Sequence, residues 1–111
     1  METVSGLWWV VVLLILASVL REYMRLNEEF HFSIYRAAGR DTLFAYIENL
    51  WLRVGPYMTL LFDSVEFYQL ASVCHGRILA ALAARDPVAA KATVQDDINA
   101  AAHHLAAQFR D

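Results

Sequence analysis

The sequence predicts an all-α protein: an antiparallel helical bundle preceded by an apolar N-terminal helix. Three observations lead to this prediction. From residue 21 onward apolar residues recur at helical spacing, and no alternating strand pattern of useful length appears. The 111 residues are enough for one domain with a modest core, and 59% of them are hydrophobic. Helix start and stop signals then divide the chain into helices with short connections.

The first element is an apolar segment, METVSGLWWVVVLLILASVL, in residues 1–20. The 18 residues between Glu2 and Arg21 carry no charge, which is near the lower limit for a helix that crosses a bilayer. We do not expect a cleaved signal peptide, because a basic leader and a cleavage motif are missing. Arg21 and Arg25 follow the segment, so a spanning helix would leave the domain on the cytoplasmic side. Three interpretations stay open: membrane contact through residues 7–20, burial of this segment against the domain, or a start unrelated to the fold.

The predicted domain comprises residues 21–111. Its first helix, over residues 21–38, is expected to end at Gly39, because glycine readily adopts the left-handed conformation of a helix C-cap. A second helix begins at Asp41. It must end or kink at Pro56, because proline has no amide hydrogen to donate and clashes with the preceding turn.

Two further helices complete the predicted bundle. The third is expected to begin at Asp63, which has capping-box spacing to Glu66. Its predicted core face carries Leu70, Cys74, Ile78 and Leu82. The fourth, over residues 88–108, follows Asp86 and Pro87, because a carboxylate caps free amides and proline is tolerated in the first helical turn. It is rich in alanine, so neighbouring helices can approach it closely.

Composition excludes several classes of function. A net charge of −3 provides no basic surface for nucleic acid. The single cysteine, Cys74, excludes an intrachain disulfide and fits a reducing compartment. No glycine-rich phosphate loop, paired-cysteine zinc motif or Ser-His-Asp order is present, so we do not expect an enzyme. A metal-dependent hydrolase would lack a general base placed by any motif.

Four polar residues on the predicted helices suggest a metal site. Asn27 and His31 are four residues apart and therefore share one helix face, with about 5–6 Å between their Cβ atoms. His75 lies among apolar turns, and Asp97 lies on a face of small residues. One carboxylate with two imidazoles is a common ligand set for a divalent metal. The alternative is that each is an ordinary polar residue of a helix. His104, two turns beyond Asp97, is expected to be exposed.

Two segments carry a resemblance to a known family. LNEEFHFSIYRAAGRDTLFAYIENLWLRVGPY and CHGRILAALAARDPVAAKATVQDDI resemble the FCD domain, the C-terminal effector domain of FadR-subfamily GntR transcription regulators, over residues 22–105. The most specific elements are the FH dipeptide with a polar residue four positions before the histidine, the AAG that ends that helix, the histidine before ILAAL, and the RD before the last helix. The resemblance implies an incomplete FCD-like bundle that senses a small molecule, often a carboxylate metabolite, and signals to a winged-helix domain.

The resemblance also implies a metal-ligand set. Many FCD domains hold a divalent metal with one aspartate and three histidines. These ligands fall on Asn27, His31, His75 and Asp97, so asparagine replaces the aspartate and aspartate replaces the last histidine. The total ligand charge is kept while its position changes. Zinc, nickel or manganese is the expected metal.

The resemblance also implies that Arg53 lies near the pocket, where it could bind an effector carboxylate by a two-pronged hydrogen bond, and Tyr57 is the second predicted effector contact. No winged-helix region precedes the domain, so we expect a truncated cytoplasmic sensor that binds no nucleic acid by itself. Residues 7–20 or a second copy could fill the groove left by an incomplete bundle, and we expect a homodimer. The alternative is a structural or interaction module with a vestigial pocket, anchored in the inner membrane with its domain facing the cytoplasm.

Overall fold

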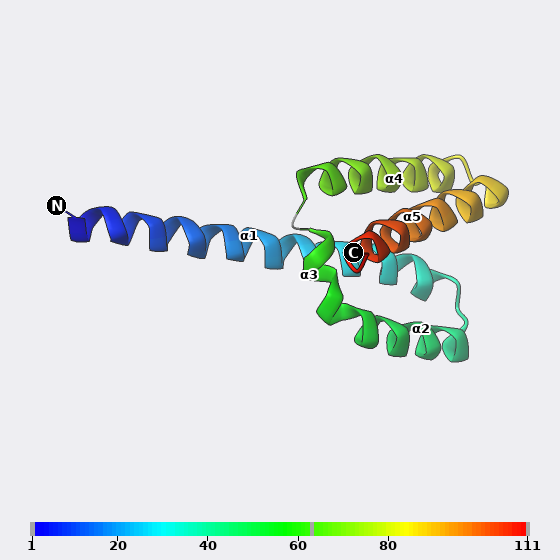
Figure 1. Ribbon diagram of the computed structural model, residues 1–111. Helices are drawn as coiled ribbons and strands as arrows, with labels where there is room; N and C mark the ends of the chain where they lie inside the picture. The colour runs from blue at the N-terminus through cyan, green and yellow to red at the C-terminus, as the bar shows by residue number, and fades with distance from the viewer. Residues whose placement is uncertain (1, 63, 111) are drawn as a thin grey trace. The chain divides into compact units, whose positions relative to one another are not determined.

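A computed structural model of the chain describes the backbone of residues 2–62 and 64–110, and the side chains of residues 6–62 and 64–110. Every regular element in these residues is helical, which confirms the predicted all-α class (Figure 1). The elements are α1 (Glu2–Ala37), α2 (Asp41–Val54), the 3-10 helix η1 (Gly55–Tyr57), α3 (Met58–Leu61), α4 (Val65–Ala83) and α5 (Pro87–Ala107). They form two compact units, and the boundary falls between Arg53 and Val54.

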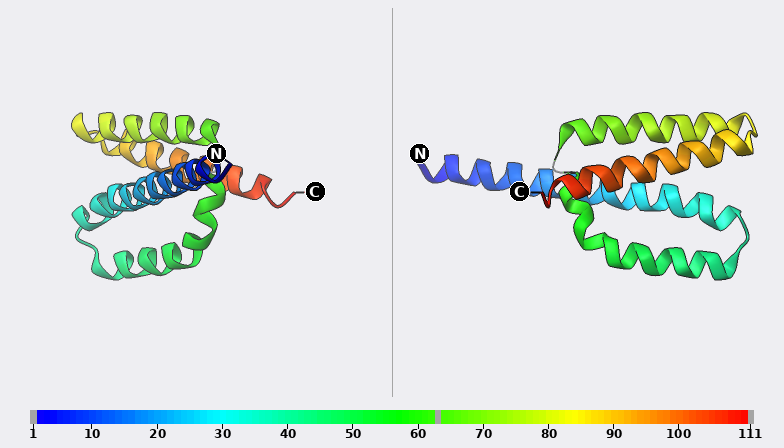
Figure 2. Two further views of the ribbon diagram at one scale, coloured as in Figure 1. Left: turned by 90° about the vertical axis from the view of Figure 1, so that its left-hand side faces the viewer. Right: turned by 45° about the vertical axis from the view of Figure 1, so that its right-hand side comes forward.

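In the first unit, α1 is one continuous helix of 36 residues. The sequence predicted a separate segment up to residue 20, but the helix passes through this position without a break. The chain has no proline before Pro56 and no glycine between Gly6 and Gly39, so nothing in this stretch interrupts the helical hydrogen bonds. Within this unit α2 runs beside only the C-terminal part of α1, and the N-terminal part extends beyond it (Figure 2). The domain boundary at residues 20 and 21 stays a prediction.

The C-terminal end of α1 and both ends of α2 lie where the sequence predicted them. Gly39 follows α1 with a φ of +66°, the left-handed conformation expected of it. α2 begins at Asp41 and ends at Val54, after which Pro56 lies in the first turn of η1. Because proline has no amide hydrogen to donate, the α-helix ends here, and the chain continues directly as a 3-10 helix.

Aromatic rings join α1 to α2. The buried Phe32 ring lies 5.5 Å from the Phe44 ring and 5.3 Å from the Trp51 ring, both edge to face. The Arg36 guanidinium lies 5.5 Å from the centre of the Phe44 ring. Such aromatic pairs contribute about 0.5–1.5 kcal/mol each beyond the area they bury, so these contacts define the helical hairpin of the first unit.

The second unit is built on a hairpin of α4 and α5, with α3 against α5 (Figure 1). Its buried apolar residues are Leu61, Phe62, Phe67, Ala71, Cys74, Ile78 and Ala81. The predicted core face of α4 was partly wrong, because Leu70 and Leu82 are exposed. Steps of four residues drift by about 40° each around a helix, whereas the observed buried positions alternate steps of four and three and stay on one face.

Side chains cap both helices of the hairpin. The Ser64 hydroxyl accepts a hydrogen bond from the Phe67 amide at 3.2 Å at the start of α4, whereas the predicted cap, Asp63, lies outside the described residues. At the start of α5 the Asp86 carboxylate accepts from the Ala89 amide at 3.0 Å. This confirms the start of the last helix that the sequence predicted.

The turn between α4 and α5 contains a feature that the sequence did not reveal. Arg85 has a φ of +54°, the left-handed conformation usually taken by glycine. The Asp86 amide donates to the Ala81 carbonyl at 3.1 Å, and the Arg85 amide donates to the Leu82 carbonyl at 3.0 Å. These two bonds are the Schellman motif, which satisfies carbonyls at the end of the helix.

Replacing Arg85 with glycine is expected to raise the free energy of unfolding by about 0.5–1 kcal/mol, because the left-handed conformation strains any residue with a Cβ. Urea unfolding followed by circular dichroism measures the change. Arg85→Ala is the matched control, since it removes the guanidinium and keeps the strain. An Arg85→Ala variant as stable as Arg85→Gly would refute the explanation by backbone strain.

Candidate metal centre

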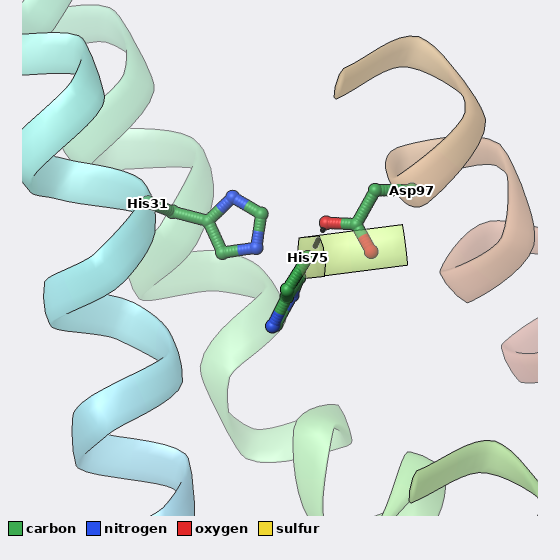
Figure 3. A group of neighbouring side chains, drawn as sticks. All are labelled: His31, His75 and Asp97. Atoms are coloured by element: carbon green, nitrogen blue, oxygen red, sulfur yellow. Dashed lines mark ion pairs between the residues drawn. The ribbon is translucent and has the colours of Figure 1, made fainter. Parts of the chain in front are cut away.

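The hairpin of the second unit brings two predicted ligands together. His75 lies in the middle of α4 and Asp97 in the middle of α5. The His75 Nε2 atom is 3.4 Å from the Asp97 Oδ2 atom, and the two side chains are 18% and 10% exposed. Figure 3 draws this ion pair as a dashed line, together with His31 of α1.

The local sequence explains why both side chains point inward. His75 follows the buried Cys74 on α4 and therefore lies at the edge of the buried face. Asp97 is buried on α5, a helix whose inner face otherwise consists of small or half-buried residues. Burying a carboxylate is unfavourable unless a hydrogen-bond donor, a positive charge or a metal compensates, so Asp97 needs such a partner.

The charge of Asp97 also affects the thiol beside the pair. Burial, and in second place the Asp97 carboxylate, raises the pKa of the Cys74 thiol above its ordinary value. Both effects disfavour the thiolate, which is the form that binds metals and reacts with electrophiles. Cys74 is therefore expected to act as a small apolar core residue, as its position on the predicted core face suggested.

The distance between His75 and Asp97 suits two ligands of one ion. Bonds of about 2.0–2.2 Å in a tetrahedral site place neighbouring ligand atoms about 3.4 Å apart. A charge-assisted hydrogen bond between the same groups would be shorter, at about 2.7–2.9 Å. An imidazole nitrogen and a carboxylate oxygen are ligands for divalent first-row metals, so the chemistry of this pair fits a metal.

The other two predicted ligands lie on α1 in the first unit. Asn27 and His31 are both buried, whereas Glu28 and Glu29 between them are exposed. This alternation confirms that Asn27 and His31 share one face of the helix. The His31 ring lies 5.5 Å from the Trp51 ring of α2. An amide and an imidazole are thus buried on one face of α1.

The predicted effector contacts occupy more open positions. Arg53 is exposed in the last turn of α2. Tyr57 lies in η1, about half exposed, and its ring is 6.1 Å from the Phe109 ring. Their role in effector binding stays a prediction.

His104 differs from its predicted environment. It was expected to be exposed, but it is half buried and its ring lies 4.9 Å from the Phe67 ring of α4. Its Nε2 atom has essentially no accessible surface. The reason is its position seven residues after Asp97, which returns it to the same face of α5. This heptad spacing was the sequence signal that could have revealed it.

A protein-family match covers the part of the chain that contains His75 and Asp97. The FCD domain family matches residues 15–100 of the chain, well over half of its length. The chain belongs to the FCD domain family. The match begins inside the apolar segment, seven residues before the resemblance recognised in the sequence. No curated protein and no solved structure matches the chain.

Membership in the FCD family gives the chain a general role. FCD domains are all-helical, effector-binding domains of GntR-type regulators, which are non-catalytic, and some of them bind a metal. The observed all-helical fold agrees with the family.

Proposed function

We propose that this FCD domain is the small-molecule sensor of a GntR/FadR-type regulator and that a divalent metal in its pocket helps to bind a carboxylate metabolite. The observation that supports this most is the His75–Asp97 pair, with its ligand atoms 3.4 Å apart. The proposed location of the sensing domain is the cytoplasm, and the proposed assembly is a homodimer, in line with the oligomerisation found in the family.

In this proposal His31 and Asn27 complete the ligand set of His75 and Asp97. The burial of both side chains supports it, because buried polar groups need polar partners. Zinc, nickel or manganese fits two imidazoles, one carboxylate and an amide oxygen.

The proposed effector is a small carboxylate held by the metal-bearing pocket and by Arg53, with Tyr57 beside it. A guanidinium binds a carboxylate by two parallel hydrogen bonds, which sets the orientation of the ligand. The effector would shift the packing of the helices only by the difference between its affinities for the two states. With a net charge of −3, this chain would pass its signal to a partner protein or a second copy rather than to DNA directly.

Metal content tests the proposal. Elemental analysis of the tag-free protein is expected to find close to one metal ion per chain, and His31→Ala and His75→Ala are expected to lose it. His103→Ala is the matched control, because His103 is exposed and should leave the metal in place. A wild-type protein without metal under metal-replete conditions would contradict the metal-assisted pocket. Metal retained in His31→Ala would contradict the role of His31.

A second candidate function is an interaction module with a vestigial pocket, anchored through its N-terminal helix. Two observations favour it. Asn27 and Asp97 depart from the ligand residues that the FCD resemblance implies, and the apolar side chains at the start of α1 are exposed. If the protein binds no metal, this function becomes the better explanation.

A further inference from the structure

The N-terminal part of α1 exposes large apolar side chains on every side. All ten residues from Leu7 to Leu16 are large and apolar, and each is 40–69% exposed. Ten consecutive residues point in all directions around a helix, since each is rotated by about 100° from the last. A helix that packs against one neighbour has a polar side that faces water, and this stretch has none. We call residues 7–20 the apolar segment of α1.

The exposed side chains of this segment can be removed from water only by surroundings that are apolar on every side. One further helix would cover only a stripe of it, whereas lipid chains would cover its whole circumference. Lipid also requires that polar groups be satisfied within the helix. Ser18 meets this condition, because its hydroxyl donates to the Leu14 carbonyl at 2.9 Å one turn earlier. Within the described part of the chain, α1 is the one helix long and apolar enough, by length and composition, to cross a membrane.

The two ends of the segment have the residues typical of membrane interfaces. Trp8 and Trp9 lie near its beginning, where indole rings favour the boundary between lipid and water. Charged residues begin directly after it: Arg25 pairs with Glu22 at 2.6 Å and with Glu29 at 3.0 Å. The apolar segment itself is about 21 Å long, and the 18 uncharged residues before Arg21 extend the uncharged helix to about 27 Å, compared with the roughly 30 Å of a hydrocarbon core.

We propose that α1 crosses a phospholipid bilayer, with its apolar segment in the hydrocarbon core and Arg21 at the cytoplasmic interface. Because α1 continues unbroken, it ties the sensor to the membrane without a flexible linker. Asn27 and His31 then lie about 10 and 17 Å along the helix beyond Leu20, close to the membrane surface. This proposal adds a membrane partner to the sensing function and does not depend on metal binding.

Labelling of cysteines across a vesicle membrane tests the proposal. The full chain is reconstituted into vesicles of phosphatidylcholine and phosphatidylglycerol and treated with a membrane-impermeant maleimide before and after detergent. Gly6→Cys and Gly76→Cys are a matched pair, because a Cβ added at either helical position has no atom within 4 Å apart from the adjacent residues and backbone of its own helix. The wild type is the blank, since Cys74 is buried and burial raises the pKa of its thiol.

For a spanning helix, the two cysteines lie on opposite sides of each membrane. In a chain that carries both substitutions, each molecule is then expected to take one label before detergent and the second label after it, as counted by mass spectrometry, and the chain floats with the vesicles after alkaline carbonate washing. Molecules that take both labels or neither label before detergent would show a helix lying in the surface and would overturn the proposal. A wild-type chain that stays in the aqueous fraction, as a monomer or as a defined oligomer, would overturn it too.

A charge in the middle of the apolar segment provides a second test. Leu13→Lys is expected to lower the vesicle partition coefficient on the order of 100-fold, because lysine at the centre of a spanning helix is strongly unfavourable. Leu79→Lys is the control, since Leu79 is an exposed leucine on α4 and should change partitioning little. Equal partitioning of Leu13→Lys and the wild type would argue against a spanning helix.

Discussion

Replacing Ile78 with alanine is expected to lower the free energy of unfolding by about 3 kcal/mol. Ile78 is 0% exposed on α4, so the lost methyl and methylene groups are not replaced by solvent and leave a cavity. A domain of this size is typically stable by only about 5–15 kcal/mol, so the loss would be a large share of the total. The melting temperature should fall by about 10 °C or more.

Leu79→Ala is the matched control for this prediction. Leu79 is the next residue on the same helix but is 55% exposed, so its truncation should change stability by no more than about 0.5 kcal/mol. Urea unfolding monitored by circular dichroism compares the two variants. An equal loss of stability in both would mean that the outer face of α4 is also covered in solution, contrary to the assignment of the buried face.

Exchanging the two unusual ligands is expected to strengthen metal binding. The double variant Asn27→Asp with Asp97→His restores the one carboxylate and three imidazoles that the FCD resemblance implies. Imidazole is the preferred ligand of nickel and zinc, and the total ligand charge does not change, so we expect binding about 10–100-fold tighter. Competition with a chromophoric chelator for nickel and for zinc measures the affinity.

The two single variants complete a double-mutant cycle. Asp97→His alone leaves the site without a carboxylate, and Asn27→Asp alone places two carboxylates on the ion. If Asn27 and Asp97 bind the same ion, the effects of the two substitutions on affinity should therefore not be additive. Additive effects, or a double variant that binds no better than the wild type, would contradict a shared site.

Much of the fold could be predicted from the sequence. The all-α class, the left-handed Gly39 after the first helix, the change of helix type at Pro56 and the Asp86 cap were predicted and are observed. These features depend on neighbouring residues and on the periodicity of a helix, both of which are present in the sequence. For the same reason Asn27 and His31 could be assigned to one face of one helix.

Pairings between helices were less predictable. Spacing within α4 and α5 singled out His75 and Asp97 separately, but only the hairpin brings their ligand atoms to 3.4 Å. The contact of His104 with Phe67 was missed for a related reason, because it joins residues far apart in the chain. The distance between side chains on two helices depends on the crossing and register of the helices, which no local pattern specifies.

Local chemistry therefore determined where this FCD domain is helical, where most of its helices end and which polar residues could bind a ligand. Tertiary structure decided which side of α4 is buried, with Ile78 inside and Leu70 exposed, and it placed Arg85 in a left-handed turn. Burial and strained turns follow from the packing of one helix against another. The free energy of that packing depends on the residues of both helices together. The pattern of apolar residues within one helix therefore does not determine this free energy.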